Sequence, residues 1–390
     1  MNRRVINIHL IKRGLRSITT IAHDKVISFQ EEEKYEQKSC RVAVLGAQST
    51  TGKALALLLK QNPLISQVYL HDFESTIGLA ADLNHLDTQT IVFGFTRQDL
   101  LCALRNADII VMLGLETIKA DSPFDQKLST EGKRIVEYAT AAALHAPKAI
   151  FVDCVVPVSI TLPIISEVYR RNHWYHPGKI VGSVSQLQMR LNSMLALHQS
   201  LDPACVHVPL LGGPEEDIVL PLFSRAAPQP MGVSESHCMI NRFRKVDTDA
   251  SPYVTSDVKH EYAPHGNAYA INRLLSTIAL GLMGDSKAIS TAFVRTNLVG
   301  ACRHLVTTVL FGTQGITYNY GVPRLTQFEL QLFERITLEL NNREEMAKGF
   351  LEAISGDEQL LKSQAAATEA LYFPATVSFC APDDTIIYET

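Results

Sequence analysis

The chain has 390 residues, of which 46% are hydrophobic and 19% charged, with a formal net charge of −4. This length allows two domains with separate cores, and the small net charge gives no electrostatic reason to expect nucleic acid or an anionic membrane as partner. No apolar run reaches the roughly 18 to 20 residues that a membrane helix needs. We therefore expect a soluble protein whose partners are small molecules or other proteins.

The first 23 residues, MNRRVINIHLIKRGLRSITTIAH, carry several basic side chains and no acid before Asp24. An arginine-rich, amphipathic segment that also contains serine and threonine is typical of a mitochondrial transit peptide, which predicts import into the mitochondrial matrix. A disordered basic tail is the alternative. Residues 1–39 comprise this segment and the mixed-charge linker SFQEEEKYEQKS.

Strand-like and helical patterns alternate over residues 40–185. Short apolar runs suited to buried strands are RVAVLG (41–46), QVYLHD (67–72), ADIIVML (107–113) and AIFVDCVV (149–156). Helical patterns cover GKALALLLKQN (52–62) and GKRIVEYATAAALHA (132–146). This alternation predicts βαβ units and an α/β, Rossmann-type domain with a doubly wound parallel sheet.

The pattern changes beyond residue 186. DIVLPLF (217–223) predicts a strand, whereas AINRLLSTIALGLMG (270–284) and LTQFELQLFERITLELNNREEMAKGFLEA (325–353) predict long helices. We expect a second, α+β domain over residues 186–355. Residues 356–390 have no strong period and form an extension whose order the sequence does not define.

A candidate dinucleotide site lies in VLGAQSTTGKAL, where Gly46 ends the first strand and Gly52 begins the following helix. A strand, a glycine turn and a helix N-terminus that includes Thr51 present backbone N–H groups and a positive dipole end to a pyrophosphate. Asp72 ends the second strand, where its carboxylate can accept both ribose hydroxyls of an adenosine. Because that carboxylate would repel a 2′-phosphate, the pattern favours NAD over NADP.

Ser49 stands where the usual motif has its middle glycine, at the closest approach of the backbone to the phosphates. Its Cβ crowds that approach, whereas its hydroxyl offers one hydrogen bond. These two effects of Ser49 on phosphate binding oppose each other. NAD is the predicted cofactor, and the sequence does not determine how tightly the protein binds it.

The seven cysteines are widely spaced and include no C-x-x-C pair, so we expect reduced thiols. Asp82, His85 and Asp87 in DLNHLD come nearest to a metal-ligand cluster, but a polar helix end is the simpler interpretation. We therefore predict no metal site.

Several segments resemble the malate dehydrogenase family of the mitochondrial type, over roughly residues 40–352. They are VAVLGAQSTTGKALALLLKQNPLISQVYLHD, GLAADLNHLDT, LPIISEVY, SLDPACVHVPLLGG and VLFGTQGI. The resemblance implies a lactate/malate dehydrogenase fold, a homodimer, and NAD-linked interconversion of malate and oxaloacetate.

The general base that this reaction needs is missing. Removing hydride from a secondary alcohol requires a base for the hydroxyl proton, and the family uses a histidine oriented by an aspartate. By resemblance, Pro214 in LLGGPEEDIVLPL stands at the histidine position and Leu187 at the aspartate position. Proline has no side-chain donor or acceptor, and loss of a positioned base lowers the rate by about 10²- to 10⁴-fold.

The arginines that would grip a substrate carboxylate at two points are also largely replaced. By resemblance, Arg190 persists at a substrate position. In the segment matching the mobile loop, LETIKADSPFDQKL, Lys119 stands near the first loop arginine and Asp125 near the second. Val156 replaces an asparagine that touches cofactor and substrate, so Arg190 is the one member of this apparatus that is unchanged.

Two neighbouring side chains are candidate replacements for the base. His207 lies about 20 Å upstream of Pro214 along an extended strand and is better explained as a strand residue. Glu215, the first of three acids after Pro214, could act if it turned inward and its pKa rose, although a run of acids is usually a solvated turn.

The leading hypothesis is a catalytically impaired or inactive pseudoenzyme that keeps the fold and pairs with itself or with an active paralogue. Binding of a small dicarboxylate is not expected. The alternative is a working NAD-dependent malate dehydrogenase, or a related 2-hydroxy acid dehydrogenase, with an altered base.

Overall fold

The computed structural model describes residues 18–19, 28–29, 39–114, 124–245 and 263–368. Residues 1–39 and 40–390 form two separate units. In the first, β1 (Ile18–Thr19) and β2 (Ser28–Phe29) pair antiparallel. The rest of the predicted transit peptide lies outside the described residues.

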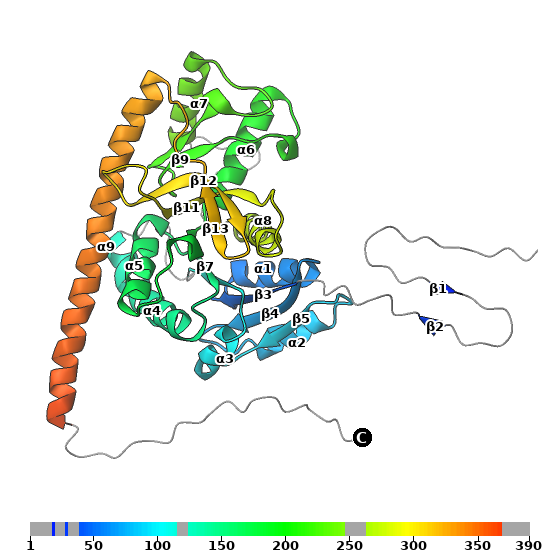
Figure 1. Ribbon diagram of the computed structural model, residues 1–390, viewed down its shortest axis with the longest axis vertical. Coiled ribbons are helices and arrows are strands. Elements are labelled where there is room, and N and C mark those ends of the chain that lie inside the picture. Colours follow the sequence, from blue (N-terminus) through cyan, green and yellow to red (C-terminus); the bar gives the residue numbers. More distant parts are fainter. Residues whose placement is uncertain (1–17, 20–27, 30–38, 115–123, 246–262, 369–390) are drawn as a thin grey trace, which may run out of the picture. The chain divides into compact units, whose positions relative to one another are not determined.

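The second unit contains a parallel sheet (Figure 1). Its strands are β3 (Cys40–Leu45), β4 (Ile65–His71), β5 (Ile91–Gly94), β6 (Ile109–Leu113), β7 (Ile150–Cys154) and β8 (Ile180–Gly182). They lie in the order β5-β4-β3-β6-β7-β8. This is the doubly wound Rossmann order, in which the strand order reverses between β3 and β6, and such sheets bind ligands in a crevice at the carboxyl ends of the strands at this point.

Helices cover both faces of this sheet, which is why its strands are nearly continuous apolar runs. They are α1 (Thr50–Gln61), α2 (Ile77–Asn84), α3 (Leu100–Leu104), α4 (Phe124–His145), α5 (Val158–Arg171) and α8 (Pro264–Leu282). Alternate residues of β3 enter different cores, as the period of a strand requires. Val42 and Val44 pack in the cluster of α1 and α8, whereas Ala43 and Leu45 pack in the cluster of α4 and α5.

Antiparallel strands continue the same sheet beyond β8. They are β9 (Leu210–Gly212), β10 (Val219–Pro221), β11 (Ile289–Arg295), β12 (His304–Gly312) and β13 (Gly315–Asn319). Phe293 of β11 pairs with Gly182 of β8, so the sheet runs without a break across the boundary predicted at residues 185 and 186. The strand expected over 217–223 is shorter, because Phe223 begins a 3-10 helix.

The remaining helices are α6 (Ser185–Gln199), α7 (Val233–Lys245) and α9 (Gln327–Thr368). Short 3-10 helices cover Arg97–Asp99, Pro177–Lys179, Pro203–Cys205 and Phe223–Arg225. The long helix α9 passes through the boundary predicted at residue 355 and lies along α5 (Figure 1). Within the described ranges, no helix combines the length and apolar character that crossing a membrane requires.

One prediction about the cysteines is wrong. Cys102 is disulfide-bonded, whereas Cys40, Cys154, Cys205, Cys238 and Cys302 are free thiols. The expectation rested on spacing along the chain, and a disulfide can join residues that are distant in sequence.

The polar residues considered as metal ligands lie at a helix end. Asp82 belongs to the last turn of α2, and His85 is the C-cap of that helix. Among the residues that the structure describes, no three His, Cys, Asp or Glu side chains form a group suited to a metal ion.

Candidate functional site

The glycine loop after β3 has the backbone geometry that a nucleotide-binding turn requires. Gly46 has a φ of 88°, which favours glycine, and the N–H groups of Gly46 and Ala47 donate to the His71 carbonyl oxygen at 3.0 and 3.3 Å. A Cβ added to Gly52 would lie 2.5 Å from the Gly46 carbonyl oxygen. Glycine at both positions therefore lets the loop fold closely against the start of α1, with Thr51 in the first turn of that helix.

Ser49 is the N-cap of α1. Its Oγ accepts a hydrogen bond from the Gly52 N–H at 2.9 Å and donates to the Gly46 carbonyl oxygen at 2.8 Å. Such a cap satisfies one of the orphan N–H groups at a helix start. The hydroxyl, which the sequence offered as a donor to a phosphate, is thus used inside the loop.

Asp72 follows β4 directly and fastens the glycine loop to the end of that strand. Its Oδ2 accepts from the Gln48 N–H at 2.8 Å, and its Oδ1 accepts from the Phe73 N–H at 2.7 Å. A carboxylate has about four lone-pair sites. Asp72 can therefore hold the loop and keep acceptor capacity for a further donor, and its contact with a ribose hydroxyl stays a prediction.

Two charged residues of α4, Glu131 and Arg134, lie where β3 and β6 end. Arg134 Nη2 donates to the Leu113 carbonyl oxygen at 2.9 Å and pairs with Glu131 Oε1 at 3.2 Å. Both residues are 4% exposed. Nε and Nη1 of Arg134 are buried and have no hydrogen-bond partner within the described part of the chain. Unsatisfied charged donors are unusual in a protein interior and call for an explanation.

This pair was not predicted from the sequence, because charged residues on a helix usually face solvent. A signal was present, since Glu131 and Arg134 precede buried Ile135 and Tyr138 by four residues each. Residues four apart share one helix face. Helical period alone therefore places both charges on the buried face of α4.

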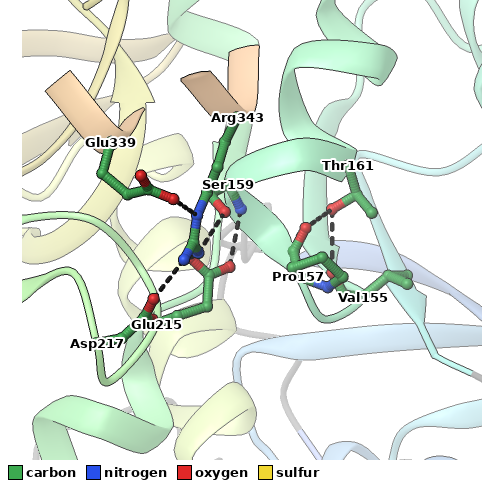
Figure 2. A network of polar contacts seen from close by, with 8 residues as sticks. All are labelled: Val155, Pro157, Ser159, Thr161, Glu215, Asp217, Glu339 and Arg343. Carbon is green, nitrogen blue, oxygen red and sulfur yellow. Dashed lines mark hydrogen bonds and ion pairs between the residues drawn. The ribbon is translucent and has the colours of Figure 1, made fainter. Parts of the chain in front are cut away.

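The acidic turn after the glycine pair is held by ion pairs. Arg343 of α9 contacts Glu215, with 3.2 Å between Nη1 and Oε2, and also contacts Asp217. Glu216 pairs with Arg190 of α6. Figure 2 shows the Arg343 guanidinium facing the turn. The interpretation of these acids as a solvated turn is wrong for Glu215, whose side chain is 12% exposed, because α9 brings Arg343 against it.

Glu215 is also the most buried carboxylate around Arg343. Its Oε1 accepts from the Ser159 N–H at 2.9 Å, which joins the turn to the start of α5. Burial raises the pKa of Glu215 to about 7, although the nearby Arg343 acts in the opposite direction. Arg343 also pairs with Asp217 and Glu339, so its single positive charge does not fully compensate three carboxylates.

Asp153 at the end of β7 is a second buried acid near the turn. It lies 2.6 Å from the Thr161 hydroxyl and accepts from the Val155 N–H at 3.0 Å. Burial raises the pKa of Asp153 to about 7. The Thr161 hydroxyl also lies near the carbonyl oxygens of Val155 and Pro157, so this network shapes the segment that leads into α5 (Figure 2).

The two positions matched to the catalytic dyad are both apolar and buried. Pro214 is buried in the turn, and Leu187 on α6 is 7% exposed. Leu187 belongs to the same hydrophobic cluster as Leu211 and Ile218, which flank the turn. Neither position offers a proton acceptor.

Arg190 lies one turn beyond Leu187 on α6. Its guanidinium pairs with Glu216 and lies 5.7 Å from the centroid of the Phe243 ring. The arginine matched to a substrate carboxylate therefore already holds a carboxylate from its own chain.

Of the other candidate residues, the structure describes Val156 and His207. Val156 is 47% exposed and has no polar side-chain atom, and His207 forms a backbone bridge with Ala227. Lys119 and the side chain of Asp125 lie outside the described residues.

The raised pKa of Glu215 predicts a pH-dependent stability. The unfolded chain loses this proton near its ordinary pKa of 4.5, whereas the folded protein keeps it up to about pH 7. Stability should therefore fall as the pH rises between these values, by at most about 3 kcal/mol from this group. Urea unfolding from pH 4 to pH 8 should show a shallower decline for Glu215→Gln, with Glu216→Gln as the matched control. Parallel curves for wild type and Glu215→Gln would contradict the assignment.

Comparisons with known proteins agree with this architecture. Residues 40–182 match the family described as lactate/malate dehydrogenase, NAD binding domain. Mitochondrial malate dehydrogenase of Felis catus is 30% identical over 306 residues, covering 78% of this chain and 89% of that protein. The human mitochondrial malate dehydrogenase is 29% identical over 320 residues, covering 82% and 94% respectively.

Solved structures show the same fold. Apo malate dehydrogenase from Picrophilus torridus has a TM-score of 0.67 at 16% identity, covering 80% of this chain and 99% of that one. Lactate dehydrogenase from Eimeria maxima, solved with NADH and oxamate, has a TM-score of 0.66 at 18% identity, covering 80% and 95%. The predicted fold class is confirmed.

Proposed function

The chain belongs to the lactate/malate dehydrogenase family, and from that premise we propose that it is a catalytically impaired or inactive relative of malate dehydrogenase that keeps a nucleotide crevice. The observation that carries this proposal is the Arg190–Glu216 pair. A dicarboxylate substrate would have to displace a carboxylate that is tethered to the same chain. Tethered groups have a high effective concentration, so free substrate competes poorly.

The absence of a general base lowers the catalytic rate in addition to the weakened substrate binding. Buried Pro214 and Leu187 supply no group that could take the hydroxyl proton of malate. Loss of the base lowers the rate by about 10²- to 10⁴-fold, and an occupied Arg190 weakens substrate binding as well. The two effects act on the same complex and are not strictly additive.

The residues of the crevice fit NAD in part. Gly46, Gly52 and Asp72 have the backbone shape and the carboxylate that the adenosine half needs, whereas the Ser49 hydroxyl is used as a helix cap. NAD, when bound, would supply hydride chemistry. This chain's own residues would hold its ribose and phosphates, but they lack the proton acceptor that hydride transfer requires.

A steady-state assay tests the proposed loss of activity. We expect the purified full chain to oxidise NADH with oxaloacetate at least about 10⁴-fold more slowly than the human mitochondrial relative, from loss of the base and weakened substrate binding. The human enzyme assayed in parallel is the control. Turnover within tenfold of that enzyme would refute the proposal.

A second candidate function is a dehydrogenase that uses Glu215 as its base. The observation in favour is that Glu215 turns inward beside Pro214 and has a pKa raised to about 7 by burial, close to the working pH of a general base. Against it, both carboxylate oxygens are engaged, one with the Ser159 N–H and one with Arg343. If the assay detects turnover, Glu215→Gln should abolish it under this second function and leave it unchanged under a structural role.

A further inference from the structure

Arg134 carries unused donors at the crevice where the strand order reverses. Its Nη1 lies 3.6 Å from where a Cβ on Gly46 would be, at the first residue of the glycine loop. One nitrogen, Nη2, is occupied by the Leu113 carbonyl oxygen and Glu131, while Nε and Nη1 have no hydrogen-bond partner among the residues that the structure describes. Nη1 lies against the loop, and the guanidinium carbon lies 5.7 Å from the centroid of the Tyr138 ring.

Two independent features of the crevice therefore suit an anion. The first is the N-terminus of α1, where backbone N–H groups and the helix dipole favour a phosphate. The second is the buried guanidinium of Arg134. Charged donors without a hydrogen-bond partner are unfavourable away from water, and a phosphate oxygen that accepts their hydrogen bonds would remove this cost. An arginine fork also matches phosphate geometry better than an isolated point charge does.

The negative charge of Glu131 does not remove the preference of this site for an anion. Its carboxylate pairs with Nη2, and it lies near Gly114, with Oε1 3.6 Å from where a Cβ on that glycine would be. The guanidinium thus has Nη2 on Glu131 and Nη1 close to the Gly46 loop. A ligand at the loop meets the donors of Arg134, and Glu131 keeps that side chain in place.

We propose that Arg134 binds the diphosphate group of a nucleotide seated on the Gly46 loop, as a positioning cation contributed by α4. This rests on the proposal that the crevice takes a nucleotide, but not on the loss of catalysis. The phosphate chemistry then dominates recognition. ADP, whose terminal phosphate carries an additional negative charge, is expected to bind more tightly than NAD, whose two phosphates carry one negative charge each.

Calorimetric titration of the full chain with ADP, NAD and adenosine tests this role. Arg134→Met should weaken ADP binding by about 10- to 100-fold, the range for a lost charge-assisted hydrogen bond. Adenosine binding should change less than about twofold, because adenosine has no phosphate. Lys133→Met is the matched control, since it removes an exposed charge from the adjacent residue of α4 and should leave ADP affinity unchanged.

The double variant Glu131→Gln/Arg134→Met covers the case in which Arg134→Met alone leaves Glu131 buried without its cation and fails to fold. It should fold and show the same selective loss of ADP affinity. The inference is overturned if the full chain does not bind ADP, if the Arg134 variants lose no more ADP affinity than Lys133→Met, or if adenosine affinity falls equally. Malate dehydrogenase turnover is measured separately from ADP binding. If the protein turns over substrate and its ADP binding depends on Arg134, the proposed inactivity is refuted and the inference about Arg134 still holds.

Discussion

Replacing Arg343 with methionine is expected to lower the free energy of unfolding by about 3–5 kcal/mol at pH 8, the usual cost of removing one partner from a buried ion pair. Arg343 has a side chain that is 3% exposed and pairs with Glu215 at 3.2 Å. Without it, Glu215 would remain buried beside Ser159 with no cation. Urea unfolding followed by circular dichroism measures the loss.

The loss should depend on pH in a defined direction. Burial raises the pKa of Glu215 to about 7, so near pH 5 this carboxyl is already protonated in the folded protein and needs its cation less. Arg343→Met should therefore cost less at pH 5 than at pH 8, and adding Glu215→Gln should recover part of the loss. Glu339→Gln is the control, because it removes a 46% exposed partner of the same arginine and should cost under about 1 kcal/mol. Equal losses at the two pH values, or equal losses for both single variants, would contradict the prediction.

Restoring the missing dyad is expected to revive turnover only when Glu216 is neutralised as well. Leu187→Asp with Pro214→His supplies a base and its orienting carboxylate, but Arg190 stays paired with Glu216. Adding Glu216→Gln frees that guanidinium for a substrate carboxylate. We expect the triple variant to oxidise NADH with oxaloacetate about 10²-fold faster than wild type, at the low end of the range for a general base.

Two controls separate the contributions to this revival. Glu216→Gln alone should give no increase, because the base is still absent, and the Leu187→Asp/Pro214→His pair should gain less than tenfold. Thermal unfolding of each variant verifies that the dyad is accommodated in the cluster that contains Leu187. A triple variant no faster than wild type, or a double variant equal to the triple, would show that Glu216 does not block the substrate position.

The basic partners of the acidic turn come from distant parts of the sequence. Glu215, Glu216 and Asp217 are consecutive, and nothing near them in the sequence indicates that each has a basic partner. Arg343 lies 128 residues from Glu215, and Arg190 lies 26 residues from Glu216. Side-chain pairing over such separations depends on how helices pack on the sheet, which a local pattern does not specify.

The doubly wound parallel sheet, the glycine turn with Asp72 and the lack of an ionisable group at Pro214 and Leu187 could be predicted from the amino-acid sequence, because period, residue type and motif spacing are local properties. The roles of the remaining charged residues became visible only in the folded chain. It turned Glu215 inward against Arg343, gave Arg190 an internal carboxylate, and buried Arg134 beside Gly46 with unused donors. These roles could not be predicted because the stability of a charge depends on its burial and on partners from distant segments, and both are set when the chain folds.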